Sequence, residues 1–280
     1  MLTGSSIGMG RALAEGLALA GAKVVISSRK GDVCEDTAAA INELCGEERA
    51  IAIPCNIGYK EQLQNLVDET HRQLGAIDIL VGNAGVNPFY GPSAEIPDSA
   101  FDKTLSSNIK SNHWLCHMVL PEMVERQDGV IIITSSNGAY SPSLMLGTYA
   151  ISKAADLALV RNLAAEYGQY NIRVNALCPG VFKTRFAAAI WQDEDGNEIP
   201  TVDVPLQRYG DPEELRGVGV FLASKAASFM TGQGLVIDGG VVMVRRHEPE
   251  PSPNRAPAEP EPSPSRARSS HSRARTYTGD

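Results

Sequence analysis

The sequence predicts an α/β fold in which a parallel β-sheet is covered by helices on both faces. Helical and strand-like segments alternate along the body of the chain, a pattern typical of parallel sheets built from β-α-β units. A glycine-rich turn opens the chain at 3–10. With 280 residues, 43% of them hydrophobic, the chain can hold one large domain or two small ones, and the unbroken alternation favours one.

The expected elements follow from apolar runs and helical periodicity. In Asp-Pro-Glu-Glu-Leu, Asp211 is the expected N-cap of a helix and Pro212 its first residue. The loop that precedes this helix, 180–209, is rich in aromatic and acidic residues. No repeat of 20–50 residues is present. The other expected elements are helix 8–20, strand 23–27, helix 32–45, strand 50–55, helix 60–74, strand 76–82, helix 98–125, strand 130–134, helix 148–168, strand 172–178 and strand 234–240.

The first strand is almost absent from the sequence. An apolar strand should run into the glycine-rich turn, yet only Met1 and Leu2 precede Thr3. That strand would be central and buried on both faces. Loss of several Val- or Ile-type residues, at roughly 1.5–3 kcal/mol each, approaches a domain's whole stability of roughly 5–15 kcal/mol. We therefore expect a truncated first strand, and a natural product that starts further upstream.

Composition excludes several classes of protein. A net charge of −8 and a pI of about 5.2 argue against a nucleic-acid groove. The most apolar early stretch, 7–26, carries Arg11, Glu15 and Lys23, so no membrane span is expected there. No signal peptide and no metal-ligand spacing of histidines are found, so the expected location is cytoplasmic and no metal site is predicted. The cysteines are odd in number, never CxxC, and are read as reduced thiols: Cys34, Cys45, Cys55, Cys116 and Cys178.

The composition changes near Arg245. Of the 17 prolines, seven lie in 249–264, and a Ser/Arg-rich run follows. Such a segment has almost nothing apolar to bury, so a domain over 1–244 and a disordered tail over 245–280 are expected. The tail arginines could contact acidic partners, but a solvated tail is the favoured interpretation.

The turn Thr-Gly-Ser-Ser-Ile-Gly-Met-Gly predicts a dinucleotide site. Gly4, Gly8 and Gly10 lie where a strand would lead into a helix, and a pyrophosphate can rest on such a helix N-terminus. Glycines let the backbone approach the phosphates closely. A lone glycine-rich turn is a weak signal, but here the rest of a β-α-β unit follows, which favours a Rossmann-type, doubly wound, three-layer α/β/α domain.

The end of the next strand favours NADP over NAD. A carboxylate at this place would bind the ribose 2′-hydroxyl of NAD, but Ser28, Arg29 and Lys30 stand there instead. These side chains can hold a 2′-phosphate. The alternative is an ordinary basic loop after a strand.

Three side chains can act together on one carbonyl oxygen. Tyr149 and Lys153, four residues apart, would share a helix face. The ammonium should favour the phenolate and pull the pKa of Tyr149 down from its usual value near 10. Ser136 ends an apolar strand and can donate a hydrogen bond to the same oxygen. Alone, a YxxxK pair is more often a surface pair; with the serine and the glycine-rich start, the catalytic interpretation is favoured.

A set of motifs in order along the chain is similar to one enzyme family. They are TGxxxGxG, GNAG at 82–85, Asn108, Ser136, Tyr149 with Lys153, PGVFKT at 179–184 and VIDGG at 236–240. Over about residues 2–243 the chain resembles the short-chain dehydrogenase/reductase family. Within it, runs such as VVISSRK and IDILVGNAGVNPFYG look most like the NADPH-dependent carbonyl (retinal) reductase branch.

The resemblance implies a fold, an assembly and residue roles. It implies seven parallel strands in the order 3-2-1-4-5-6-7, and commonly a homotetramer, or a homodimer, built on helices 98–125 and 148–168. Tyr149 would be the general acid–base, and Ser136 would polarise the carbonyl. Lys153 would lower the pKa of the tyrosine and hold the nicotinamide ribose. Asn108 would fix a water that links Lys153 to solvent, although an Asn satisfying a helix kink is compatible with that position.

The resemblance also implies a set of cofactor contacts. Many members have Asp beside the adenine where this chain has Asn56, whose amide oxygen can still accept a hydrogen bond. Relatives in the branch often end in a peroxisomal tripeptide, but this chain ends Thr-Gly-Asp. The implied cofactor residues are Gly4, Ser6, Ile7, Gly8, Ser28, Arg29, Lys30, Asn56, Ile57, Asn83, Ala84, Gly85, Tyr149, Lys153, Pro179, Gly180 and Thr184.

The expected reaction is NADP(H)-dependent reduction of a ketone or aldehyde, or oxidation of the matching secondary alcohol. Acids in the 180–209 loop make a strongly anionic substrate less attractive, although a solvated loop tip is the default interpretation of these acids. A 3-oxoacyl-thioester or sugar/polyol dehydrogenase would use the same residues, and a non-catalytic protein could follow from the truncated strand. Aromatic side chains suggest a small apolar substrate, although packing explains half of them equally well: Phe89, Tyr90, Tyr140, Phe182, Phe186 and Trp191.

Overall fold

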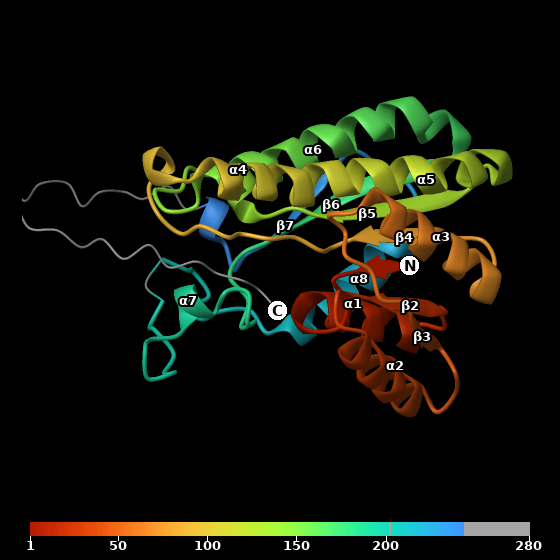
Figure 1. The fold of residues 1–280 in the computed structure, drawn as a ribbon, viewed down its shortest axis with the longest axis horizontal. Coiled ribbons are helices and arrows are strands. Elements are labelled where there is room, and N and C mark those ends of the chain that lie inside the picture. The colour runs from red at the N-terminus through yellow and green to blue at the C-terminus, as the bar shows by residue number, and fades with distance from the viewer. Residues whose placement is uncertain (202, 244–280) are drawn as a thin grey trace, which may run out of the picture.

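Seven parallel strands form one sheet in the order β3-β2-β1-β4-β5-β6-β7, as the sequence predicts (Figure 1). The structure, a computed structural model, describes residues 1–201 and 203–243. The predicted tail, 245–280, lies outside the described residues. The strands are β1 (Leu2–Thr3), β2 (Val24–Ser27), β3 (Ala50–Ala52), β4 (Ile79–Gly82), β5 (Gly129–Thr134), β6 (Ile172–Pro179) and β7 (Gly234–Ile237).

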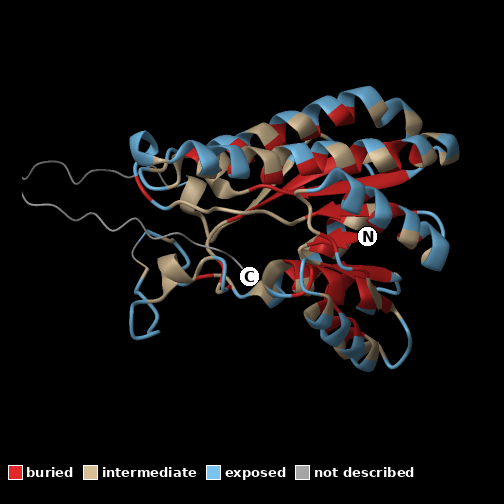
Figure 2. Cartoon of the chain, in the orientation of Figure 1, coloured by how far each residue is buried: buried red, intermediate tan, exposed pale blue. Residues whose placement is uncertain are grey.

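Helices cover both faces of the sheet, so the architecture is the expected three-layer α/β/α sandwich. In Figure 1, α3, α4, α5 and α6 lie on one side of the strands, and α1, α2 and α8 on the other. Two apolar clusters fill the spaces between the layers, where Figure 2 shows the buried residues. The helices are α1 (Gly8–Leu19), α2 (Gly31–Cys45), α3 (Lys60–Leu74), α4 (Asp98–Leu105), α5 (Ser111–Arg126), α6 (Gly147–Tyr167), α7 (Ala188–Trp191) and α8 (Leu215–Ala223).

The turn that leads into helix α8 is capped by Asp211, as the sequence predicts. The side chain of Asp211 accepts a hydrogen bond from the backbone N–H of Glu213 (3.0 Å), and Glu214 accepts one from the backbone N–H of Asp211 (2.8 Å). This capping box first forms a 3₁₀ turn, Pro212–Glu214, and α8 continues from it. The sequence therefore predicted the start of this helix correctly, with a tighter first turn than expected.

Two segments differ from the sequence prediction. The single helix expected over 98–125 is divided by one π-helical stretch, Ser106–Lys110, between α4 and α5. A π turn inserts one residue and displaces the normal i→i−4 hydrogen bonds. The 180–209 loop contains the short helix α7, which was not predicted.

Strand β1 is as short as the sequence indicates, yet it is paired on both sides. Leu2 lies opposite Ile26 of β2 and Val81 of β4. The carbonyl of Met1 accepts from the backbone N–H of Val81 (2.9 Å), and the Met1 amino group donates to the carbonyl of Ile79 (2.9 Å). The amino group is thereby buried at the edge of β4, and the Met1 side chain packs towards α3, where Oγ1 of Thr70 donates to its sulfur (3.5 Å); Met1 as a whole is 7% exposed.

In a polypeptide that begins at Met1, this buried amino group predicts a pH-dependent stability. Burial lowers the pKa of the Met1 amine from 8.0 to about 5. Between these values the unfolded chain binds a proton that the folded chain does not, so the free energy of unfolding falls as the pH drops. We expect a loss of roughly 4 kcal/mol between about pH 8 and about pH 5. Urea unfolding at both pH values checks this, and equal midpoints would contradict it.

None of the described helices is both long and apolar enough to cross a membrane.

Candidate active site

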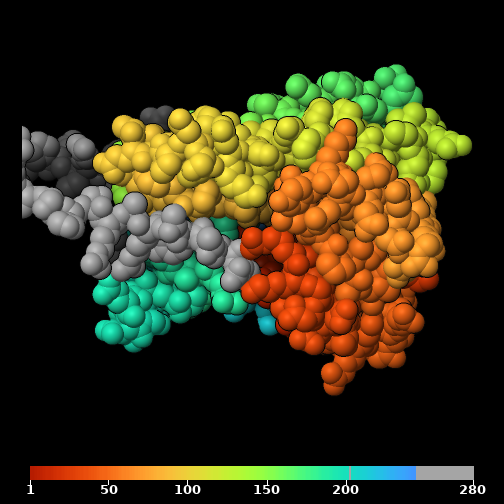
Figure 3. Space-filling model, in the orientation of Figure 1, coloured from red at the N-terminus to blue at the C-terminus, as the bar shows by residue number. Residues whose placement is uncertain are grey.

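A cavity of about 430 Å³ opens at the carboxyl ends of the strands, across the β1–β4 boundary where the strand order reverses. Figure 3 shows the N-terminal segment at the surface beside a hollow in this part of the molecule. A smaller cavity of about 180 Å³ adjoins it and is lined by Ser136, Pro179 and Gly180. The predicted residues lining the larger cavity are Gly4, Ser6, Ile7, Gly8, Ser28, Arg29, Lys30, Asn56, Ile57, Asn83, Ala84, Gly85, Tyr149, Lys153 and Thr184.

The glycine-rich turn has no room for a side chain at Gly4 or Gly10. Gly4 has φ +62°, and a Cβ built on it would lie 2.8 Å from the Cα of Ala84. A Cβ on Gly10 would lie 2.2 Å from the Gly4 carbonyl oxygen and 2.5 Å from Nδ2 of Asn83. Asn83 holds the turn from the far side, because its Nδ2 donates to the carbonyls of Thr3 (3.1 Å) and Gly4 (3.0 Å). The turn therefore presents bare backbone at the start of α1, which fits a pyrophosphate.

The end of the cavity beside β2 is cationic. Ser28, the residue after β2, accepts a hydrogen bond from Oγ of Ser6 (Oγ–Oγ 2.9 Å). Arg29 and Lys30 follow it and line the cavity, and Lys30 is the N-cap of α2. Among the described residues, no carboxylate lines this cavity. Asn56 also lines it, although its Oδ1 already accepts from the backbone N–H of Gly58 (3.1 Å).

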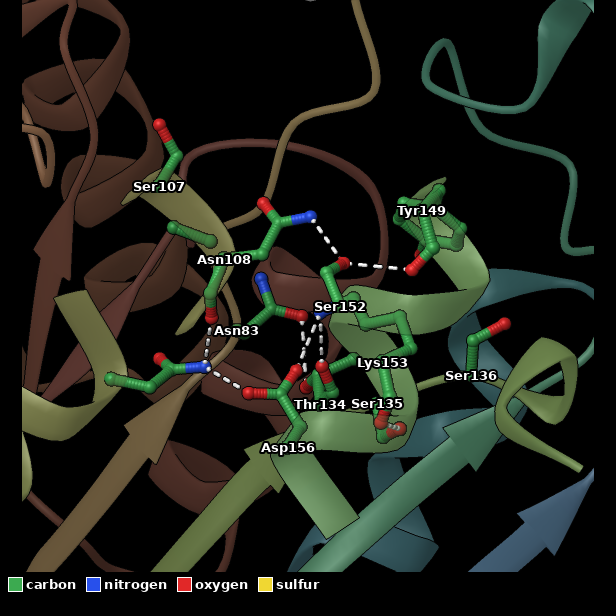
Figure 4. A network of polar contacts seen from close by, with 12 residues as sticks. Asn83, Ser107, Asn108, Thr134, Ser135, Ser136, Tyr149, Ser152, Lys153 and Asp156 are labelled. Atoms are coloured by element: carbon green, nitrogen blue, oxygen red, sulfur yellow. Dashed lines mark hydrogen bonds and ion pairs between the residues drawn. The ribbon is translucent and has the colours of Figure 1, made fainter. Parts of the chain in front are cut away.

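Three of the four predicted catalytic side chains, those other than Asn108, lie close to one another. Tyr149 and Lys153 project from α6, with Nζ of Lys153 5.8 Å from the centre of the Tyr149 ring. The same Nζ donates to the carbonyl of Thr134, at the end of β5 (2.8 Å). Ser136 follows β5, and its Oγ accepts from the backbone N–H of Gly138 (3.1 Å). Figure 4 shows Lys153 within a dense polar network, with Tyr149 and Ser136 at its edge.

The sequence predicts that Lys153 lowers the pKa of Tyr149 below its usual value, and this is wrong in the structure, where the pKa is raised. Burial raises the pKa of the phenol, and the nearby Asp156 carboxylate adds to that increase. Lys153 and the Ser136 side chain act in the opposite direction, as expected, but they do not outweigh burial. The sequence indicated the nearby cation but neither the degree of burial of the phenol nor the presence of Asp156 beside it.

Asn108 lies behind the cavity wall and does not line it. It is fully buried within the π-helical stretch. Its Oδ1 accepts from the backbone N–H of Val86 (2.8 Å), and its Nδ2 donates to the Val86 carbonyl (3.0 Å) and to Oγ of Ser152 (3.0 Å). These contacts hold the segment after β4 against α6, next to Lys153. The role of Asn108 in fixing a water stays a prediction.

Sequence reasoning missed two buried polar residues beneath Lys153. Asp156 accepts from Nζ of Lys153 (Oδ2, 3.1 Å), and Asn112 donates to its other oxygen (3.0 Å). The available signal was a carboxylate three residues after Lys153 in an otherwise apolar helical stretch. It also missed other cavity-lining residues, including Met9, Lys103, Ser107, Thr134, Ser135 and Arg185.

The loop aromatics separate into lining and packing residues. Phe186 is 45% exposed, lines both cavities and lies 6.1 Å from the Tyr149 ring, centre to centre. Tyr90 lines the smaller cavity. Phe182 does both: it is buried in the core on the α1 side of the sheet and also lines the smaller cavity. Trp191 lies outside both cavity linings and donates through Nε1 to the Thr184 carbonyl (2.9 Å). Phe89 and Tyr140 also lie outside both linings.

The fold and this site define a dinucleotide-dependent oxidoreductase. The family model described as enoyl-(acyl carrier protein) reductase matches residues 4–242. Dehydrogenase/reductase SDR family member 4 of Bos taurus is 40% identical over 241 residues, which cover 86% of this chain and 85% of the relative. The Homo sapiens protein of the same name is 39% identical and covered to 86% on both sides. The chain belongs to the short-chain dehydrogenase/reductase family, whose members use a nicotinamide cofactor on CH–OH and C=O groups.

Solved structures agree with this assignment. A gluconate 5-dehydrogenase from Burkholderia cenocepacia, in complex with NADP and tartrate, is 30% identical with a TM-score of 0.79, covering 87% of this chain and 94% of that one. Levodione reductase is 29% identical with a TM-score of 0.80, covering 87% and 97%. The family predicted from the sequence is thus confirmed, and the family member 4 relatives fit the predicted branch.

Proposed function

We propose that this protein is an NADP(H)-dependent carbonyl reductase that interconverts a ketone or aldehyde and the matching alcohol. The observation that carries the proposal is the position of Tyr149. It lies on the shared wall of the larger, cationic cavity and the smaller one, beside Lys153 and near Ser136. A cofactor in the first cavity and a carbonyl compound in the second would meet at the phenol.

In the proposed reduction, each catalytic side chain has a separate role in delivering the proton to the carbonyl oxygen. NADPH would supply the hydride to the carbonyl carbon. Tyr149 would give its proton to the carbonyl oxygen, while the Lys153 ammonium stabilises the phenolate that remains. Oγ of Ser136 accepts from the backbone N–H of Gly138 and donates only over a long contact to Oδ1 of Asn137 (3.5 Å), so its hydrogen can turn to the substrate oxygen instead. Lys153 would also hold the nicotinamide ribose.

The preference for NADP rests on Arg29 and Lys30. Replacing both with alanine is expected to weaken NADPH binding by roughly 10- to 100-fold, because each removes a cation that can meet the 2′-phosphate. NADH, which lacks that phosphate, should bind as before. Melting curves with each nucleotide measure the preference directly, since a bound ligand raises the melting temperature.

The control for this pair is Lys23→Ala, which removes an exposed cation just before β2 and outside the cavity lining. It should leave both melting shifts unchanged. If the parent protein is stabilised equally by NADPH and NADH, the NADP assignment is wrong.

The substrate cavity favours a small apolar carbonyl compound. Phe186, Tyr90, Leu146 and Ile190 contribute apolar lining. A sugar acid is the second candidate, because Arg185 lines both cavities and could pair with a carboxylate, and because gluconate dehydrogenases are among the structural relatives. A 3-oxoacyl thioester would use the same catalytic residues. Turnover of an aromatic ketone, gluconate and a 3-oxoacyl thioester under identical conditions discriminates them.

We further propose a homotetramer or homodimer that uses the outer faces of α4, α5 and α6. Phe101 on α4 is 37% exposed and Ile151 on α6 is 57% exposed. Exposure of these apolar side chains to water is unfavourable, and a second copy of the chain packed over them would remove it. Light scattering of the purified protein measures the assembly.

A cytoplasmic, reducing location is in keeping with the five free cysteines, four of them buried.

A further inference from the structure

A buried ion pair lies directly beneath the catalytic lysine. Asp156 follows Lys153 by three residues on α6, so both side chains lie on the same helix face. Its Oδ2 lies 3.1 Å from Nζ, and its exposure is 0%. Figure 4 shows the two side chains pointing toward each other, with Thr134 close by. Asp156 does not line either cavity, so it influences a substrate or cofactor through Lys153 and through the electrostatics of Tyr149 rather than by contact.

Asn112 fixes the other side of this carboxylate. Its Nδ2 donates to Oδ1 of Asp156 (3.0 Å) and to the backbone carbonyl of Asn108 (2.8 Å). The π-helical stretch Ser106–Lys110 contains Asn108 and leads into α5, where Asn112 lies. A continuous set of contacts therefore runs from the Asn108 carbonyl through Asn112 and Asp156 to Nζ of Lys153. A buried carboxylate is costly unless it is paired and hydrogen-bonded, and here both oxygens have donors.

We propose that Asp156, held by Asn112, is a positioning residue for Lys153, fixing its ammonium against the Thr134 carbonyl and setting the pH range in which Tyr149 works. This inference rests on the acid–base function proposed for Tyr149. It adds a negative charge to a site that otherwise combines a phenol with a cation.

The direction of the effect follows from the charges that face Asp156. On α6 these are Lys153 and Tyr149, and a carboxylate raises the pKa of both. The thiols facing it are Cys116 on α5 and Cys178 on β6. Burial raises the pKa of Cys116 to about 12 and also raises that of Cys178, so both stay neutral at working pH. Removing the negative charge should therefore lower the pKa of Tyr149 and Lys153 together.

The test replaces Asp156 with asparagine, which keeps the size and an amide oxygen but removes the charge. In the oxidation direction the Tyr149 phenolate is the base, so activity rises with pH as the phenol ionises. The kcat profile should have two limbs: a rise as Tyr149 ionises and a fall at higher pH as Lys153 loses its proton. We expect both limbs to move to lower pH by about one unit in the variant. Ultraviolet difference titration of tyrosinate, with Tyr149→Phe as the reference, should show the same shift without any substrate. Unmoved limbs together with an unmoved titration overturn the proposal.

Matched variants separate charge from structure. Glu166→Gln makes the same chemical change at an exposed position of α6 and should leave the profile in place. Asp156→Glu restores the charge and should return the limbs toward the parent values even if kcat falls. If Asp156→Asn does not fold, Asp156→Ser removes the charge with a smaller side chain. A fall in kcat with both limbs unmoved means a structural role only, and overturns the proposal.

Failure of the underlying function has a different signature. If Tyr149→Phe keeps parental activity, the acid–base assignment of Tyr149 fails, whatever Asp156 does. If Tyr149→Phe is inactive while Asp156→Asn keeps the parental profile and titration, only the positioning role is refuted.

Discussion

Replacing Tyr149 with phenylalanine is expected to lower carbonyl turnover by roughly 10²- to 10⁴-fold, the usual contribution of a positioned acid–base group. The change removes one hydroxyl from a half-buried ring that lines both cavities. The ring contacts with Phe186 and Lys153 remain, so cofactor binding and the melting temperature should stay near the parental values. Steady-state kinetics with NADPH, together with cofactor titration of the same variant, measure both effects.

The control is Tyr167→Phe, the same chemical change at the last residue of α6. Tyr167 packs against the core on that side of the sheet and lines neither cavity. Its rates should match those of the parent. Parental turnover in Tyr149→Phe would show that another group supplies the proton.

Replacing Gly10 with alanine is expected to abolish cofactor binding at working concentrations and to destabilise the fold by about 1–3 kcal/mol. The new Cβ would collide with the Gly4 carbonyl at 2.2 Å and with Nδ2 of Asn83 at 2.5 Å. The first collision is with backbone, so α1 must move away from the turn that would receive the pyrophosphate. Urea unfolding and NADPH titration measure the two consequences.

Gly217→Ala is the matched control, because it also places a methyl group on a helix. Nothing lies within 4 Å of the Cβ position at Gly217, which is exposed in α8. This change should stabilise the protein by about 0.5–1 kcal/mol, since alanine is the better helix former. If the two variants behave alike, close packing of the turn is not what Gly10 provides.

The sequence predicted the fold well because each strand and helix carries a local pattern. Apolar runs and glycines set the strand positions, and Asp211 with Pro212 marked a helix start that the structure confirms. The interruption at Ser106–Lys110 could not be predicted this way. It depends on contacts that Asn108 makes with Val86 and Ser152, which are distant in sequence.

The sequence identified the residues of the candidate site but did not predict the pKa of Tyr149. Motif spacing identified Ser136, Tyr149 and Lys153, and the fold brings them to one place. Whether burial or the ammonium decides the Tyr149 pKa depends on packing from several elements, which no local pattern contains. Asp156 was overlooked because a single acidic residue in a helix is ordinarily exposed, whereas here it is 0% exposed.

The two-residue strand β1 has a mechanical consequence. Among the described residues, β1 is registered with β2 at Leu2 and Thr3, but with β4 at Leu2 alone. Met1 adds two hydrogen bonds to β4, so this short segment couples the two halves of the sheet at the edge of the larger cavity. Residues on both sides of β1 line that cavity, so a bound dinucleotide would add contacts across the segment. Cofactor binding is therefore expected to stabilise the centre of the sheet.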